Sequence, residues 1–91
     1  MIQTGNTIVF KNGNGKLDFY WLCEIRTNEY LFFNWYGNPR RAESTDFWKI
    51  GKEWFDAKVK DGTIEIYDSL PEKYMDIFEQ QAIERNNTNL Y

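Results

Sequence analysis

Alternation of apolar and polar residues with a period of two dominates the N-terminal third of the chain and favours β-strands. Residues 17–25 alternate most clearly, and one predicted face of this strand carries Leu17, Phe19, Trp21, Cys23 and Ile25. Residues 7–11 alternate in the same way, and residues 30–35 are apolar at nearly every position. Residues 12–15 and 27–29 are rich in the residue types that favour tight turns. The sequence therefore predicts three antiparallel strands joined by short turns.

Residues 54–67 carry a similar signal, because apolar and polar side chains alternate on both sides of Asp61 and Gly62. An Asp-Gly dipeptide between alternating segments is typical of a two-residue hairpin turn. We therefore predict a hairpin that turns at Asp61-Gly62. Residues 46–52 fit either a short strand or one helical turn, and the pattern leaves both open.

The period changes to that of a helix after the predicted hairpin. Ser69 precedes Glu72 at the spacing of a capping box, and Pro71 falls in the first turn. An apolar stripe with helical spacing follows, formed by Tyr74, Ile77, Phe78, Gln81 and Ala82. These features predict a helix over residues 69–85 that Ser69 caps and that Ile77 and Phe78 anchor, with a polar tail over residues 86–91.

The size and composition of the chain indicate one small globular domain. The 91 residues are 42% hydrophobic and 27% charged, which is typical of a folded chain rather than a disordered one. We expect a single domain over residues 1–91, with an antiparallel sheet or barrel over residues 1–67. The predicted fold class is therefore mainly β with one C-terminal helix, arranged as a small antiparallel barrel or rolled sheet.

The composition removes most catalytic chemistry. The chain has no histidine and one cysteine, which excludes histidine acid–base catalysis, an internal disulfide and a cysteine zinc site. Asp18 and Glu24 would lie about 20 Å apart on one strand, too far for a glycosidase-type carboxylate pair. Cys23 has no basic neighbour on its strand face, so we expect a core thiol. The sequence predicts a chain that is not an enzyme and that has no metal site and no cofactor.

The charge distribution limits the class of partner. The net charge is −3, with nine basic and seven acidic residues in residues 1–60 and two basic and seven acidic residues in residues 61–91. Binding to duplex nucleic acid needs a basic surface, so the acidic balance argues against it. No apolar run is long enough to span a bilayer, and no N-terminal signal precedes the first strand. A chain with a single cysteine and no N-terminal secretion signal suggests a reducing compartment, and we expect a cytoplasmic chain with no membrane partner.

The segment over residues 31–38 resembles a known signature. It reads L-F-F-N-W-Y-G-N and is similar to the strand-and-turn signature of Tudor domains, which often reads V-x-F-x-D-Y-G-N. Residues 21–25 look like the second-strand pattern of the same family, and residues 5–7 resemble the opening of SH3-like barrels. The resemblance covers residues 5–46, and residues 36–38 are its sharpest element. It implies a small antiparallel SH3-like barrel.

The same resemblance implies a binding site. Tudor domains bind methylated lysine or arginine in an aromatic cage. Carried over by position, the cage would consist of Phe10, Trp21, Phe33 and Tyr36, with Asn38 as a polar partner. Trp35 stands where the family usually has aspartate, and residues 47–91 extend past what the family explains. The alternative is that these aromatic side chains form part of the core.

Aromatic residues are unusually abundant, at 19% of the chain. Tryptophan, tyrosine and arginine dominate the hot spots of protein interfaces, and arginine also binds phosphate in a forked geometry. Candidate binding residues cluster around one polar loop: Trp35, Tyr36, Asn38, Arg40, Arg41, Trp48 and Trp54. This mixture suits a protein partner, and it equally suits a nucleotide or another anionic small ligand. A third interpretation is that a helix simply covers the second apolar face.

These observations together predict recognition rather than catalysis. We expect a small binding protein that acts by stoichiometric occupation of a protein partner, as an adaptor or as an inhibitor. In style it is similar to the small acidic inhibitors that phages deploy against host defences. The alternative is a small-ligand binder that sequesters a nucleotide or similar anion in a pocket lined by aromatic and arginine side chains.

Overall fold

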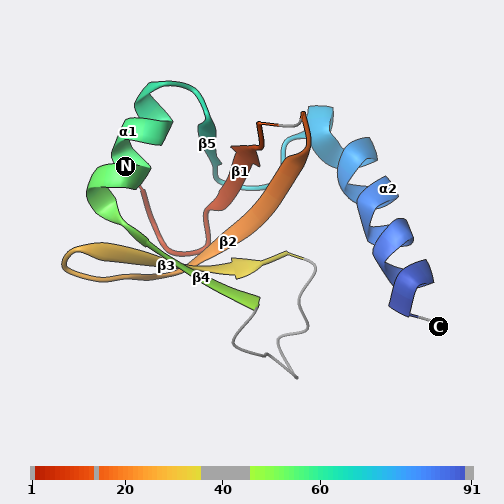
Figure 1. Ribbon diagram of the computed structural model, residues 1–91, viewed down its shortest axis with the longest axis horizontal. Helices are drawn as coiled ribbons and strands as arrows, with labels where there is room; N and C mark the ends of the chain where they lie inside the picture. Colours follow the sequence, from red (N-terminus) through yellow and green to blue (C-terminus); the bar gives the residue numbers. More distant parts are fainter. Residues whose placement is uncertain (1, 14, 36–45, 90–91) are drawn as a thin grey trace.

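The computed structural model describes residues 2–13, 15–35 and 46–89, and its strands form one antiparallel sheet (Figure 1). In chain order the elements are β1 (Thr7–Lys11), β2 (Leu17–Ile25), β3 (Glu29–Asn34), β4 (Phe47–Gly51), α1 (Lys52–Lys60), β5 (Ile64–Tyr67) and α2 (Glu72–Asn89). The strand order is β4-β3-β2-β1-β5, so β4 and β5 form the two edges. The predicted antiparallel, mainly β fold with a C-terminal helix is confirmed. The sheet is not closed into a barrel, and α1 is a second helix that the sequence analysis did not predict.

The three N-terminal strands form where the alternation predicts them, because the intervening residues make tight turns. Between β1 and β2 the Asn12 N–H donates to the Lys16 carbonyl over 2.8 Å, and Gly15 takes a φ of 84°. Between β2 and β3 the Arg26 N–H donates to the Glu29 carbonyl over 2.9 Å. Both turns are closed by local bonds, which is why short-range sequence signals were sufficient to predict them.

A β-bulge interrupts the alternation of β2. The pairing with β3 shifts by one residue between Leu22 and Glu24, which leaves Cys23 as the bulged residue. The shift moves Glu24 and Ile25 to the faces opposite those predicted from a strict period of two. The predicted single apolar face of this strand is therefore correct only as far as Trp21.

The predicted hairpin over residues 54–67 is wrong, because its first half is the helix α1. Phe55 and Val59 are four residues apart, so their spacing fits one face of a helix as well as one face of a strand. Glu53 lies in the first turn of α1 and Lys60 in the last, which complements the helix dipole. Most of the preceding ambiguous segment forms β4.

Asp61 and Gly62 end α1 instead of turning a hairpin. The Asp61 N–H donates to the Ala57 carbonyl over 3.0 Å, and the Gly62 N–H donates to the Val59 carbonyl over 3.2 Å. Gly62 has a φ of 85°, a conformation in which a Cβ atom meets the following carbonyl oxygen. Glycine at this position is therefore part of the helix end.

Gly62→Ala is expected to lower the free energy of unfolding by about 1 kcal/mol, because alanine is strained at this positive φ. Gly13→Ala is the matched control, since Gly13 lacks a positive φ and an added Cβ would meet no heavy atom within 4 Å. Urea unfolding of the two variants measures the difference. Equal losses would contradict the helix-end assignment.

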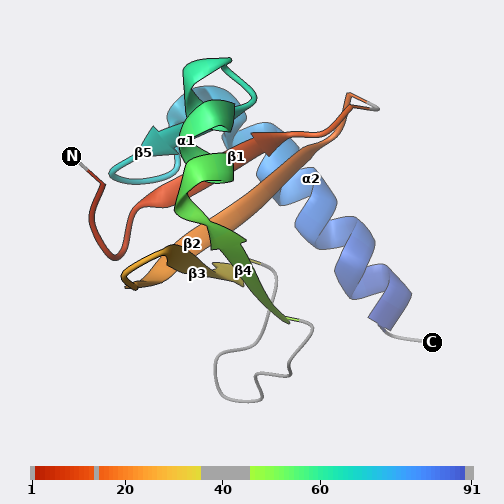
Figure 2. The ribbon, with the colours of Figure 1, turned by 60° about the vertical axis from the view of Figure 1, so that its left-hand side comes forward.

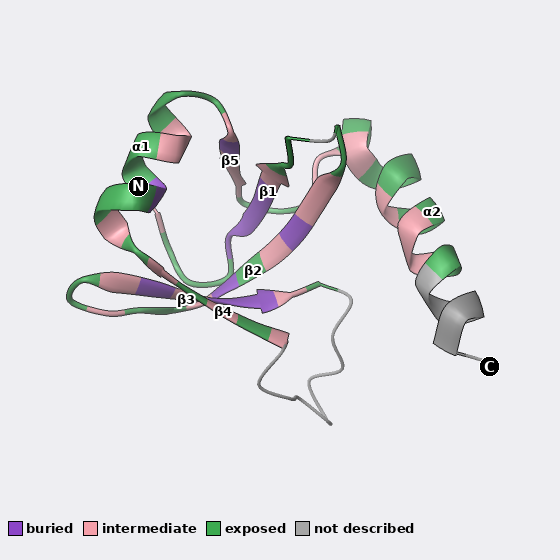
Figure 3. Ribbon diagram, viewed as in Figure 1, coloured by how far each residue is buried: buried purple, intermediate pink, exposed green. Residues whose placement is uncertain are grey.

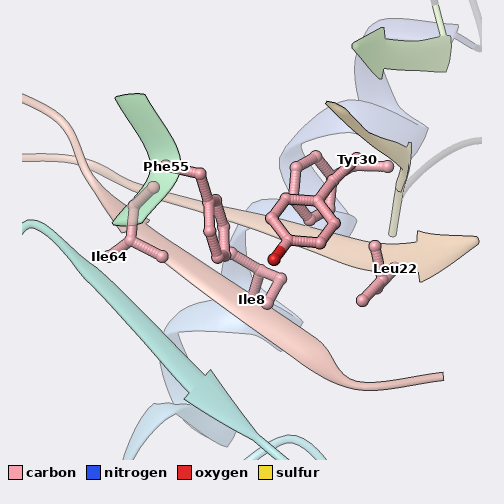
Figure 4. Packing of buried hydrophobic residues seen from close by; sticks show 6 residues of the cluster. Ile8, Leu22, Tyr30, Phe55 and Ile64 are labelled. Carbon is pink, nitrogen blue, oxygen red and sulfur yellow. The ribbon is translucent and has the colours of Figure 1, made fainter. Parts of the chain in front are cut away.

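The main core lies between α1 and the sheet. Phe55 is 1% exposed, and its ring centroid lies 4.8 Å from that of Tyr30 and 5.4 Å from that of Phe32. Figure 4 shows Phe55 reaching from α1 in among Ile8, Ile64 and Tyr30. Buried residues concentrate in the three central strands (Figure 3). The core cluster comprises Ile8, Leu22, Tyr30, Phe32, Phe55 and Ile64.

α2 covers part of the opposite face of the sheet (Figure 2). Phe19 is 1% exposed, and its ring centroid lies 5.4 Å from that of Phe78 and 6.3 Å from that of Tyr74. Trp35 also packs against Phe78, with ring centroids 5.8 Å apart. Phe78 is therefore an anchor of α2, whereas Ile77, predicted as a second anchor, is 40% exposed.

The boundaries of α2 differ from those predicted. The helix begins at Glu72, so Ser69 lies outside it and the prediction that Ser69 caps it is wrong. The Tyr74 N–H donates to the Pro71 carbonyl over 3.0 Å, which makes Pro71 the residue that starts the first turn. At the other end the helix continues to Asn89 through most of the predicted polar tail. No helix in the described part of the chain is long and apolar enough to cross a membrane.

Candidate binding surface

Four aromatic side chains from four different elements gather on the face of the sheet that α1 covers. We call this set the aromatic patch, and it comprises Phe10 of β1, Tyr20 of β2, Trp48 of β4 and Trp54 of α1. The strand register explains the gathering, since Tyr20 pairs with the core residue Ile8 and Trp48 pairs with the core residue Phe32. Side chains of directly paired residues share a face.

The rings of the aromatic patch pack against one another as one cluster. The ring centroids of Tyr20 and Trp48 are 4.8 Å apart, and those of Phe10 and Trp48 are 5.8 Å apart. Trp54 stacks on Phe10 at 6.2 Å and meets Trp48 edge-on at 6.0 Å. These separations lie in the range of favourable aromatic pairs. The cluster continues the core outward to the surface, where Trp54 is 41% exposed.

Charged groups border the aromatic patch. The Lys58 ammonium nitrogen lies 5.5 Å from the centre of the Trp54 ring and 3.9 Å from a carboxylate oxygen of Asp61. Asp18 pairs with Phe10 across the β1–β2 ladder and so lies on the same face of the sheet. An exposed aromatic centre with a charged border is the usual anatomy of a protein interface.

The structure brings together only part of the predicted binding set. Trp48 and Trp54 are in contact, whereas Trp35 packs against Phe78 on the other side of the sheet. The remaining predicted binding residues lie outside the described part of the chain: Tyr36, Asn38, Arg40 and Arg41.

The aromatic cage implied by the Tudor resemblance is not assembled by the described residues. Trp21 pairs with Phe33, and both lie on the α2 face, whereas Phe10 lies on the α1 face. A sheet separates these rings, so they cannot line one cavity. The fourth predicted cage residue, Tyr36, lies outside the described residues.

Tyr20 is the patch residue that the sequence analysis missed. It precedes Trp21, and strand alternation therefore places it on the opposite face, with Leu22. Recognising α1 as a helix would have indicated that the Leu22 face is covered and that Tyr20 lies at its border.

A polar cluster on the face of the sheet that α2 covers binds the start of α2 to the sheet. The Tyr74 hydroxyl donates to Glu65 over 2.6 Å, and the Tyr67 hydroxyl donates to the same oxygen over 2.9 Å. The Lys11 ammonium lies 3.3 Å from the other carboxylate oxygen. The hydrogen bond from Tyr74 is the largest cause of the lowered pKa of Glu65, and the interactions with Tyr67 and Lys11 act in the same direction. The Tyr74–Glu65 bond also raises the pKa of Tyr74.

The lowered pKa of Glu65 predicts a loss of stability in acid. A carboxylate with a depressed pKa stabilises the fold fully above its ordinary pKa, here 4.5, and loses that contribution as the pH falls through the folded value. Glu65→Gln should therefore destabilise the chain at pH 7 and much less at about pH 3.

Urea unfolding at the two pH values measures this difference. Glu79→Gln, which removes an exposed carboxylate of α2, is the control and should have a small effect at both. A Glu65→Gln effect that is independent of pH would contradict the role assigned to the carboxylate.

Cys23 has the properties of an unreactive thiol. Partial burial and then the neighbouring Glu24 raise its pKa, and its Sγ lies 3.7 Å from the Trp21 carbonyl oxygen. A raised pKa reduces the thiolate that nucleophilic catalysis requires. Among the residues that the structure describes, no group of three histidine, cysteine, aspartate or glutamate side chains is placed to hold a metal ion.

A hollow of about 380 Å³ lies between the start of β2 and α2. The Gln81 side chain, which lines the hollow, donates to the Leu17 carbonyl over 3.2 Å. Its lining is Lys16, Leu17, Asp18, Ile77, Gln80, Gln81 and Glu84. This set contains neither aromatic nor arginine side chains, so it is not the pocket that the nucleotide alternative requires.

In comparisons with known proteins, no family model, no curated protein and no solved structure matches this chain.

Proposed function

We propose that this chain is a non-catalytic binding protein that occupies a protein partner through the aromatic patch. The observation that carries the proposal is the exposure of Trp54, 41% of its surface, where a packed aromatic cluster reaches the surface of the molecule. Tryptophan and tyrosine lose little side-chain entropy on binding and dominate interface hot spots. The cluster holds the Trp54 ring in place before binding, which lowers the cost of association.

Occupation of a partner by such a surface makes the chain an adaptor or a stoichiometric inhibitor. We also propose a relationship with SH3-like barrels. The strand order supports it, because β1 to β4 are consecutive antiparallel neighbours and β5 returns beside β1. A small barrel closes from this order when its two edge strands meet.

A pair of tryptophan variants tests the proposed function. Trp54→Ala should weaken partner binding by about tenfold or more, as expected for a hot spot. Trp35→Ala is the matched control, because Trp35 is 39% exposed but packs against α2 on the opposite side of the sheet. Affinity capture from native lysate with the wild type and both variants, read by mass spectrometry, measures the difference.

The outcomes of this capture separate the two function classes. A discrete protein retained by the wild type and by Trp35→Ala but lost with Trp54→Ala supports the proposal. Equal retention by both variants contradicts a role for the aromatic patch. Co-purification of an ultraviolet-absorbing small molecule, lost when Arg40 and Arg41 are both changed to alanine, favours the nucleotide alternative instead.

A further inference from the structure

The alternation of hydrogen bonds along the β3–β4 ladder identifies which backbone groups of β4 point away from β3. The Lys52 N–H donates to the Asn28 carbonyl over 3.0 Å, and these two residues continue the β3–β4 register by one pair. Hydrogen-bonded and non-bonded pairs alternate along an antiparallel ladder, so Ile50 and Trp48 also bond to β3. β4 is an edge strand. The backbone groups that point away from β3 therefore belong to Phe47, Lys49 and Gly51. Of these, the Gly51 carbonyl is already bonded, because Gly51 is the N-cap of α1.

The side chains of β4 suit a second strand beside it. Trp48 belongs to the aromatic patch on the α1 face, and Ile50 shares that face. Phe47 lies on the other face and is 40% exposed. Lys49 is the single charged residue of the strand, and the strand contains no proline. The outward backbone groups of an edge strand are a template for the addition of another strand, and Lys49 is the one charge on β4 that opposes unselective pairing.

The charge of Lys49 indicates which kind of strand fits. An antiparallel pairing of two copies centred on Lys49 places Lys49 opposite itself, and like charges at paired positions are destabilising. A pairing centred on Trp48 places Lys49 opposite Phe47, which carries no charge to complement the lysine. Lys49 is exposed and forms no ion pair with any other described residue. An acidic side chain opposite Lys49 would provide the missing complement. The edge is therefore better matched to a different chain than to a second copy.

We propose that the protein partner adds an extended segment to the outer edge of β4, with an acidic residue opposite Lys49. The residues on either side of that acid are apolar and pack on Trp48 and Ile50. This inference rests on the proposed function, because it specifies how the partner reaches the aromatic patch. Backbone hydrogen bonds supply affinity, and the alternating side chains supply specificity.

A displayed library of random ten-residue peptides is the probe for this mode of binding. Selection on the wild-type chain should enrich segments with an acidic residue between two apolar residues. N-methylation of the selected peptide, one backbone position at a time, should abolish binding at alternate positions only, because only alternate N–H groups face β4. Enrichment of no peptide, or equal tolerance of N-methylation at every position, would overturn the proposal.

Two substitutions at one position test the edge from the side of the protein. Lys49→Pro removes an outward N–H that the β3–β4 ladder does not use, so the chain should still fold. It should bind the selected peptide at least about tenfold more weakly than Lys49→Ala, which removes the charge but keeps the N–H. Thermal unfolding of both variants checks the fold. If Lys49→Pro fails to fold, the N-methylation series decides the question.

The pattern across variants separates this inference from the proposed function. If Trp54→Ala loses binding of the protein partner while Lys49→Pro keeps it, strand addition is overturned and the aromatic patch remains the binding surface. If both variants bind the protein partner fully, both proposals are overturned. A dimer of the wild type that Lys49→Pro dissociates, measured by analytical ultracentrifugation, would show that a second copy occupies the edge and would overturn the proposed partner.

Discussion

Phe55→Ala is expected to lower the free energy of unfolding by about 3–5 kcal/mol. A loss of this size approaches the total stability of a domain this small, so we expect much of the variant chain to be unfolded at 37 °C. The reason is that the Phe55 ring is 1% exposed and fills the space between α1 and the sheet, where it contacts Tyr30 and Phe32. Removing it leaves a cavity that a helix of two turns cannot collapse to fill.

Trp54→Ala is the control for this prediction, because Trp54 precedes Phe55 on the same helix but is 41% exposed. It should cost much less stability, since a large part of its ring already contacts water. Urea unfolding followed by circular dichroism measures both variants. Similar losses in the two variants would contradict the burial of Phe55 between α1 and the sheet.

Phe19→Ala is the second large effect, and it acts on the other face of the sheet. Phe19 is 1% exposed beneath α2 and contacts both Phe78 and Tyr74. We expect a loss of about 3–5 kcal/mol in the free energy of unfolding. Because these two aromatic contacts tie α2 to the sheet, the helix should also lose protection from amide hydrogen exchange before the strands do.

Phe47→Ala is the matched control, since Phe47 lies on the same face of the sheet beyond the α2 contacts and is 40% exposed. It should leave the hydrogen exchange of α2 unchanged and cost little stability. If Phe19→Ala also left the exchange of α2 at the wild-type rate, the contacts with Phe78 and Tyr74 would not be what holds the helix on the sheet.

The N-terminal strands and their turns were predictable because their determinants are local. Alternation sets which residues of β1 and β2 share a face, and local bonds between Asn12 and Gly15 and between Asn12 and Lys16 close the turn that joins the two strands. The terminal helix was predictable for the same reason, since its apolar stripe has a period that no strand shares. Its first residue was not, because the Ser69 signal and the Pro71 signal lie two residues apart and both suit a helix start.

The binding surface was predictable only in part. Trp48 and Trp54 stand close in sequence and in space, and their residue type alone favours an interface. Tyr20 lies beside these two side chains only because β2 pairs with β1 and β3 in the observed register. The described members of the predicted cage of Phe10, Trp21, Phe33 and Tyr36 lie on two faces of the sheet, because a positional resemblance does not specify which face each ring occupies. Tyr36 lies outside the described residues.

By itself the sequence determined the strands of the N-terminal half, the terminal helix and the absence of histidine chemistry, all of which depend on residue type and short-range spacing. The tertiary structure decided that residues 52–60 form a helix, because a spacing of four fits both periods and only the contacts of Phe55 with the sheet choose between them. It also decided the bulge at Cys23 and the place of β4 at the edge of the sheet, since each depends on how strands pair with one another and not on the alternation within one strand. Such pairing is invisible to a local pattern, because it is selected by the packing of the whole sheet.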